Sequence, residues 1–241
     1  MTVDGWARTV RQQLGLGRLL PLGGPQDGAW IAEEAAASAL RRAADEQVPG
    51  VRLGALRIAL ADPGRTQEPV VPAPPSALPP GALRVTADFA ATAAEPLPAV
   101  ADRLREVLAQ AADRRLGLAV TEVDLRVTAL LDEVAQAAAA SPRESPSARE
   151  PAEGEEARAA AAALAVPGVA GLTGILGGLG RPVHFEERPA EAALPARHVR
   201  VEIAVRADHR AVEVAREVRT QVSQALPDHP TVAVLITAVA G

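Results

Sequence analysis

The sequence predicts an α+β fold made of two related units, each with the order helix, strand, strand, helix, strand. An Ala-rich helical stretch leads into Val48-Pro49-Gly50-Val51, and a second leads into Val166-Pro167-Gly168-Val169. After each turn come an alternating strand, an amphipathic helix and a closing strand. Each unit spans about a hundred residues, an ordinary domain size. Two units of this length argue against a solenoid, which needs at least about three shorter repeats.

Alternating hydrophobicity places the strands. The first unit alternates over residues 83–89 and 123–130, and the second over residues 199–205 and 232–239. An earlier strand is expected where Leu56, Ile58 and Leu60 alternate. Along residues 83–89 the apolar side chains point one way and the polar ones the other. We therefore expect each sheet to have one face covered by helices and one polar face.

Helical periodicity is clearest in residues 97–115. Their apolar stripe consists of Leu97, Val100, Ala101, Leu104, Val107, Leu108 and Ala111. The second unit repeats it in residues 211–226 with Val212, Ala215, Val218, Val222 and Leu226. A third helix is predicted from Ala29 to about Gln47, with Asp27 as its N-cap and a buried stripe of Ile31, Ala35, Ala39 and Ala43.

Residues 3–14 form a shorter amphipathic helix, with Val3, Trp6, Val10 and Leu14 at spacings of three and four. Two interpretations are open. In the first, the stripe covers an apolar patch of the first unit, which is the more common role of such a stripe. In the second, it docks on a membrane surface or a partner.

Composition divides the chain into four segments. Residues 1–28 are the N-terminal helix and a linker, and residues 29–131 are the first unit. Residues 132–154 combine Ala, Ser, Pro, Glu and Arg without large apolar side chains, which predicts a disordered linker. The second unit follows over residues 155–241. Within the first unit, the proline-rich residues 62–81 predict an extended, flexible connection.

Composition also restricts the classes of protein. The chain has no Cys, which excludes disulfides, thiolate nucleophiles and Cys-ligated zinc. Its net charge of −5 gives no general attraction to nucleic acid or anionic lipid. All 25 basic residues are Arg, a bias typical of a high-GC bacterial genome. No uninterrupted apolar stretch is long enough for a transmembrane helix, and no secretory signal is recognisable, so we expect a cytoplasmic protein.

No motif predicts catalysis, a cofactor or a metal site, and we expect no such residues. None of the serines lies in a nucleophile elbow. The histidines lack metal-ligand spacing, and we interpret them as surface or turn residues: His184, His198, His209 and His229. Gly171-Leu172-Thr173-Gly174 matches the glycine loop of K-homology RNA-binding domains, but it is uncharged and follows a Pro-Gly turn. A plain glycine loop is favoured.

The element order resembles the alkaline-shock, or envelope stress response, family of Gram-positive bacteria. The resemblance rests on Glu33 and residues 35–44 leading into Pro49-Gly50-Val51, on residues 83–89 and 100–112, and on Val123-Asp124-Leu125-Arg126-Val127. The second unit repeats the pattern less closely, from Ala163-Leu164-Ala165 onward. Together they cover most of the chain after residue 28. The chain departs from the usual single-unit form of the family by carrying two diverged units.

The resemblance implies a non-enzymatic cytoplasmic scaffold or adaptor that self-associates or binds a protein, such as a small membrane-anchored one, and is linked to envelope and general stress. The surfaces expected to do this are the N-terminal helix and the polar sheet faces, with Arg84, Thr86, Asp88, Glu122, Asp124 and Arg126. The alternative is a small α+β module that binds a ligand or RNA. A positively charged concave surface would favour the alternative, and an exposed apolar stripe or paired edge strands would favour the adaptor.

Overall fold

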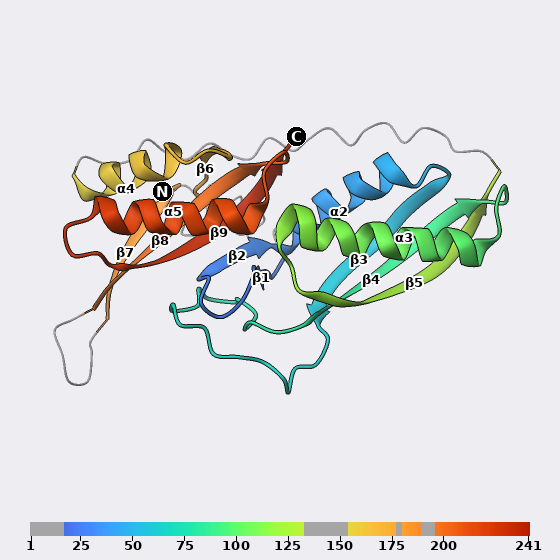
Figure 1. Cartoon of the computed structure of the whole chain (residues 1–241), viewed down its shortest axis with the longest axis horizontal. Coiled ribbons are helices and arrows are strands. Elements are labelled where there is room, and N and C mark those ends of the chain that lie inside the picture. Colours follow the sequence, from blue (N-terminus) through green and yellow to red (C-terminus); the bar gives the residue numbers. More distant parts are fainter. Residues whose placement is uncertain (1–16, 133–153, 177–179, 189–195) are drawn as a thin grey trace, which may run out of the picture.

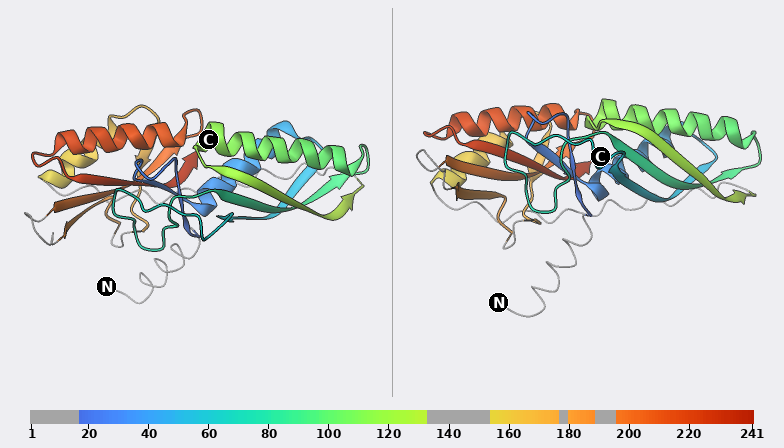
Figure 2. Two further views of the ribbon diagram at one scale, coloured as in Figure 1. Left: turned by 60° about the horizontal axis from the view of Figure 1, so that its bottom comes forward. Right: turned by 90° about the horizontal axis from the view of Figure 1, so that it is seen from below.

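The computed structural model describes residues 17–132, 154–176, 180–188 and 196–241 (Figure 1). These residues form two sheets that lie end to end along the long axis, with the helices on one side (Figures 1 and 2). Buried apolar side chains of both sheets belong to one continuous hydrophobic core. The predicted α+β class is therefore confirmed.

The smaller sheet has the strand order β3-β4-β5. Its members are β3 (Val51–Leu60), β4 (Leu83–Thr92) and β5 (Val120–Leu131). β3 is antiparallel to β4, and β5 is parallel to it. The helices α2 (Glu33–Gln47) and α3 (Leu97–Ala111) and the π-helical turn η1 (Ala112–Leu116) accompany this sheet. Both helices cover the same face, so the opposite face is open (Figure 2).

The larger sheet has the order β1-β2-β9-β8-β6, and β7 also pairs with β8. Its strands are β1 (Leu19–Pro21), β2 (Ala29–Ala32), β6 (Val169–Leu172), β7 (Val183–Arg188), β8 (Ala196–Arg206) and β9 (Thr231–Ala240). Its helices are α4 (Glu155–Leu164) and α5 (Ala211–Ala225). The sheet is wider than the three strands predicted for a unit, because β1 and β2 from the N-terminal part of the chain extend it.

The two sheets share one connectivity. In each, a helix precedes strands that are antiparallel to the central strand, and a second helix leads to a parallel closing strand. Val85 on β4 pairs with Ile58 on one side and Val123 on the other. Val201 on β8 is placed in the same way, between Val183 and Val234. This arrangement agrees with the repeated order in the sequence, whereas duplication of one unit stays a prediction.

The helices with the strongest periodicity are confirmed. Five members of the α3 stripe are buried, and Leu97 and Ala101 pack partly buried at its margin. The predicted α5 stripe is buried throughout. Since Pro98 stands in the first turn of α3, where its missing N–H is harmless, the helix begins where the sequence predicts.

The predicted start of the first helix is wrong. Residues 29–32 form β2, and α2 begins at Glu33. Asp27 is therefore not an N-cap. Its carboxylate accepts a hydrogen bond from the backbone N–H of Gly24 (2.7 Å) and from Arg216 on α5 (2.7 Å). The Arg216 guanidinium holds the pKa of Asp27 below its usual range.

Tertiary pairing explains this difference. β2 runs parallel to β9 and places Trp30 beside Leu235 and Ile31 beside Ile236. Both β2 side chains are almost fully buried there. Burial of two large apolar side chains outweighs the few tenths of a kcal/mol by which local helix propensities differ.

The proline-rich segment is also different from the prediction. It does not stay beside the first unit, because it crosses to the larger sheet and packs along β1 and β2 (Figures 1 and 2). The backbone N–H of Leu78 donates to the carbonyl of Leu19 (2.8 Å), and the indole of Trp30 donates to the carbonyl of Leu78 (3.3 Å). Val71 is buried at 1% exposure. The segment therefore closes the end of the larger sheet.

The two halves meet closely at the start of α5. Gly117, which ends η1, has φ +87°, and a Cβ there would lie 2.3 Å from a methyl carbon of Val212. Arg210 bonds the backbone carbonyl and the side chain of Asp113. Only glycine fits this close approach at a positive φ without strain.

Two predictions lie outside the described residues. They are the amphipathic helix of residues 3–14 with Trp6, Val10 and Leu14, and all but the ends of the disordered linker of residues 132–154.

Candidate functional site

The open face of the smaller sheet brings together the six polar residues that the sequence singled out. The register places Arg84 beside Glu122, Thr86 beside Asp124 and Asp88 beside Arg126. Their apolar neighbours on β4, such as Val85 and Phe89, point to the other side and are buried. The expected polar face is therefore correct for this sheet.

The charged side chains of β4 and β5 on this face are paired with one another. Arg126 makes a two-pronged contact with the Asp88 carboxylate, at 2.8 and 2.9 Å. Arg84 donates to Glu122 (2.6 Å) and lies 3.5 Å from Asp124. The Arg126 guanidinium lowers the pKa of Asp88, and Asp88 raises the pKa of Arg126. Because these pairs are exposed, each adds little to stability.

β5 is one of the two edge strands of this sheet, beside β3 at the other edge. Within the described residues it pairs only with β4, and most of its side chains are exposed. Two large apolar side chains near its carboxyl end are among the exposed ones, Val127 at 40% and Leu130 at 61%. An exposed edge strand with apolar side chains presents unpaired backbone groups to which another strand can bind.

The edge carries one partial block. Arg105 on α3 donates to the carbonyl of Val123 (3.2 Å) and forms an ion pair with Asp102 (2.6 Å). Carbonyls bonded to β4 lie between the two strands, so this contact indicates that the Val123 carbonyl points to the open side. A charged side chain over an edge is a common protection against uncontrolled pairing.

The larger sheet has no such edge at the corresponding strand. β9 occupies the place of β5, and its outer side pairs with β2 in parallel. Six consecutive residues of β9, from Val232 to Thr237, are buried. Among the described residues, the closing strand is therefore open in the smaller sheet and paired on both sides in the larger one.

The other face of the larger sheet is buried and partly polar, against the expectation of a second open polar face. Glu202 on β8 is fully buried, and its carboxylate accepts hydrogen bonds from the backbone N–H groups of Ile175 (2.7 Å) and Leu176 (2.9 Å). His184 Nε2 lies 4.0 Å from the same carboxylate. Burial lowers the pKa of His184, which favours the neutral ring at pH 7. These hydrogen bonds hold the segment with Ile175 and Leu176, which follows β6, against the sheet.

The predicted place of His198 is wrong. It was expected on a polar face, but it is 3% exposed and its Nδ1 contacts Thr231 Oγ1 at 2.9 Å. Thr173 and Thr237 form another buried contact, at 2.7 Å, farther along the same sheet. The alternation of polar and apolar residues along β8 is regular, and the sequence does not reveal that loops cover its polar side.

The glycine motif does not form a nucleic-acid loop. Gly171 and Leu172 belong to β6, and Thr173 is buried, so the motif does not join two helices as in a K-homology domain. His209 and His229 lie at element ends, as predicted, next to α5.

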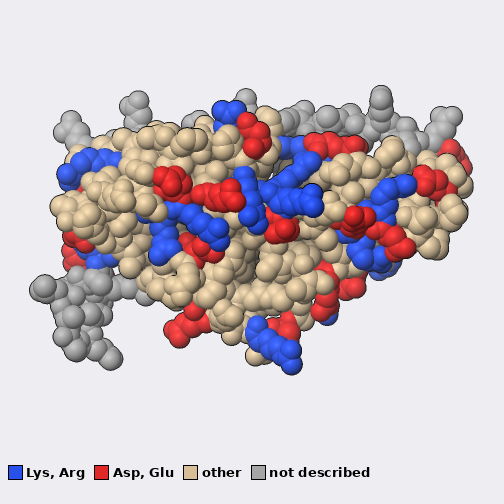
Figure 3. Space-filling view, in the orientation of Figure 1, with Lys and Arg blue, Asp and Glu red and all other residues tan. Residues whose placement is uncertain are grey.

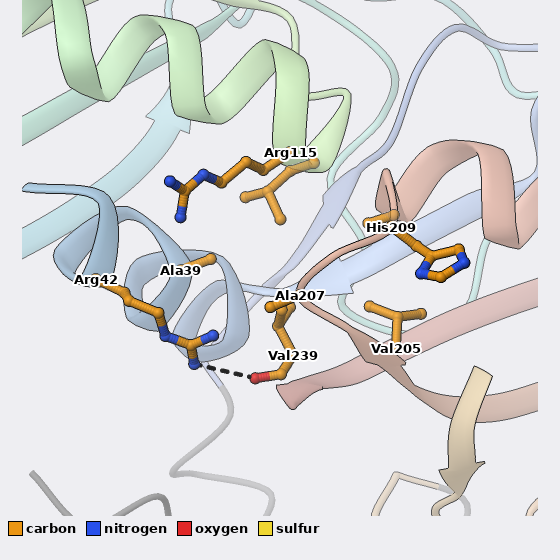
Figure 4. Close-up of a pocket in the computed structure, with 9 residues that line it drawn as sticks. Ala39, Arg42, Arg115, Val205, Ala207, His209 and Val239 are labelled. Atoms are coloured by element: carbon orange, nitrogen blue, oxygen red, sulfur yellow. Dashed lines mark hydrogen bonds between the residues drawn. The ribbon is translucent and has the colours of Figure 1, made fainter. Parts of the chain in front are cut away.

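A hollow lies between the two halves, where α2, η1 and the ends of β8 and β9 meet. This hollow has about 270 Å³ of empty space, which includes open solvent. Arg42, Arg115 and His209 contribute its polar groups, and Figure 4 shows Arg42 reaching to the carbonyl of Val239 (3.4 Å). Arg115 is paired with Glu46 at 2.7 Å.

Charge on the surface is mixed. Figure 3 shows arginines gathered near the middle of one face, with acidic side chains directly beside them.

Apart from Arg42, Arg115 and His209, the residues that line the hollow are Ala, Val and Leu. The hollow therefore has neither a nucleophile nor a carboxylate for acid–base chemistry among its lining residues.

Comparisons with known proteins identify no relative. No protein-family model matches the chain, and no curated protein sequence matches it. In the described part of the chain, no helix has the length and apolar character needed to cross a membrane. Nor do three His, Asp or Glu side chains of the described residues group as metal ligands would. The described residues define an α+β protein with an open polar face on the smaller sheet and an exposed edge strand, β5.

Proposed function

We propose that this protein is a scaffold or adaptor that associates through the β5 edge. In this proposal it acts as the resemblance to the alkaline-shock family implies, as a non-enzymatic cytoplasmic protein linked to envelope stress, through self-association or a membrane-anchored protein. The observation that carries the proposal is the unpaired edge of β5 with its exposed Val127 and Leu130.

An edge strand supplies both parts of a binding site. Its free N–H and C=O groups give affinity, and the alternating side chains give specificity. On β5 the alternate residues are Glu122, Asp124 and Arg126. The affinity for a partner strand would therefore depend on the charges that it places opposite them. A partner strand would also remove Val127 and Leu130 from water, at about 25 cal/mol per Å² of apolar surface.

The alternative, an RNA-binding module, has less support. Proteins that bind single-stranded RNA on a sheet stack its bases on exposed aromatic side chains. Neither β3, β4 nor β5 places an aromatic residue on the polar face, since Phe89 is buried at 1% exposure. Two arginines on this face, Arg84 and Arg126, are also neutralised by neighbouring carboxylates.

The alternative as a ligand-binding module rests on the hollow beside Arg42 and Arg115. Arg115 already pairs with Glu46 and Arg42 donates to a backbone carbonyl, so part of their hydrogen-bonding capacity is in use. The β5 edge needs only the displacement of Arg105. We therefore favour association.

The proposal is tested by recovery of the tagged protein from a membrane fraction of its own host. The double variant Val127→Lys and Leu130→Lys adds two charges to the edge strand, and we expect severalfold lower recovery with bound protein. Val70→Lys with Leu164→Lys is the matched control, because those side chains are equally apolar and are 60% and 51% exposed elsewhere. We expect the control to behave as the wild type.

Equal recovery of the wild type and the β5 variant would contradict the proposal. A loss of recovery only when Trp6, Val10 and Leu14 are changed to polar residues would place the contact in residues 3–14 instead, and would equally overturn the role of β5. Melting curves of all variants show whether a loss reflects unfolding.

A further inference from the structure

We propose that the β5 edge pairs with β5 of a second copy of this chain, antiparallel, about a two-fold axis at Leu125. This inference rests on the proposed function and names the partner. The result would be one continuous sheet of both copies, with β5 and its copy at the centre and the helices of both copies on one face.

Symmetry restricts the possible registers. When two copies pair edge to edge about a two-fold axis, each keeps its helix-covered face on the same side. Residues opposite each other must then come from the same face of β5, because a shift by one residue would place polar side chains opposite apolar ones. The axis must therefore pass through a residue and not between two residues.

Charge selects among these registers. With the axis at Leu125, Asp124 of each copy lies opposite Arg126 of the other, and Val123 lies opposite Val127. With the axis at Asp124 or Arg126, two like charges face each other directly. With the axis at Val123, Glu122 faces Asp124. Like charges directly opposite destabilise a strand pair, whereas opposite charges and apolar pairs stabilise it.

The backbone of β5 is compatible with this register. The contact from Arg105 indicates that the carbonyl of Val123 points to the open side. Since backbone direction alternates along a strand, the groups of Leu125 and Val127 then point there too. Any axis that passes through a residue, Leu125 included, matches these outward groups with one another, so the choice among such axes rests on the side chains. An axis at Val127 would instead meet the irregularity between Val127 and Ala129, where the register of β5 shifts.

The side chains needed for this pairing are accessible. Asp124 is 64% exposed and Arg126 is 75% exposed. Arg126 keeps Asp88 as its neighbour in the same chain, so pairing would build a row of alternating charges across the two copies. Only Arg105 must leave the Val123 carbonyl, and this requirement keeps association reversible.

The test is sedimentation of the purified full chain over a concentration series. We expect the wild type to dimerise. Asp124→Arg alone and Arg126→Asp alone should each weaken the dimer by about tenfold or more, because two attractive pairs become repulsive in each symmetric dimer. An equimolar mixture of these two variants should dimerise as the wild type does, since both cross-copy pairs are then attractive again.

Arg105→Ala is the opposite control. It frees the Val123 carbonyl without touching the charged row, so the dimer should become tighter. Melting temperatures measured at dilutions where all forms are monomeric should stay close to one another, because the substituted side chains are exposed.

Three results would overturn the inference: a wild type that stays monomeric, a dimer that the single variants do not weaken, or a mixture that fails to associate. Failure of the proposed function is a separate outcome. If the wild type stays monomeric while Val127→Lys with Leu130→Lys still abolishes recovery from the host, β5 binds a different protein and the proposed function stands. If both assays are unaffected by changes in β5, the proposed function falls as well.

Discussion

Replacing Trp30 by alanine is expected to lower the free energy of unfolding by about 3–5 kcal/mol. Trp30 is 1% exposed and lies on β2, opposite Leu235 of β9. Its indole also donates to the carbonyl of Leu78 in the proline-rich segment. The substitution therefore leaves a large cavity and removes one of the hydrogen bonds between that segment and the sheet. Denaturant unfolding of the full chain measures this loss.

Val70→Ala is the matched control, since this side chain belongs to the same segment and is 60% exposed. Its effect should stay within about 0.5 kcal/mol. A loss of less than about 1 kcal/mol for Trp30→Ala would show that the proline-rich segment does not pack on β2, because burial of a tryptophan requires more.

Leu104→Ala is expected to cost about 2–5 kcal/mol. Leu104 is fully buried in the middle of the α3 stripe, between that helix and the smaller sheet. The chain is only 2% aromatic, so few large side chains can shift to fill the space. The melting transition of the variant, compared with that of the wild type, measures the loss.

Arg103→Ala on the adjacent position provides the control. Arg103 is 40% exposed and bonds Glu95 at 2.9 Å on the helix surface. An exposed pair of this kind contributes little, so the change should stay within about 0.5 kcal/mol. Similar shifts in melting temperature for both variants would contradict the assignment of Leu104 to the buried face of α3 and of Arg103 to its exposed face.

Periodicity was sufficient to locate the elements that bury a continuous stripe. α3, α5, β4 and β5 lie where the sequence predicts them, because a helix or strand with one apolar face can be recognised without its neighbours. The six polar residues of the open face were found for the same reason. Their alternation on β4 and β5 reflects a solvated face.

What the sequence did not reveal depends on distant partners. Residues 29–32 resemble the start of a helix until β9 is placed beside them, and only this pairing makes them a strand. Glu33 and Glu202 are buried although both side chains are acidic. Glu33 accepts a hydrogen bond from the N–H of Ile58 (3.0 Å), a contact that no local pattern predicts.

The open edge of β5 was also missed. The sequence carries a signal for the solvated face of this strand, but none for its open edge. The closing strand of the second unit is apolar on both faces, whereas Glu122, Asp124 and Arg126 alternate in the first. This contrast distinguishes a strand covered on both faces from one with a solvated face. It does not show which edge is unpaired, since that depends on where β2 pairs.

Amide hydrogen exchange on β5 tests whether the protein associates through the edge of this strand. The tagged full chain would be compared as recovered with its associated proteins from the host and as dilute purified protein. Association through the β5 edge predicts slower exchange at residues 121–128 in the recovered assembly, with β9 unchanged because β2 already covers it. Unchanged exchange at residues 121–128, with new protection elsewhere in the chain, would contradict the account.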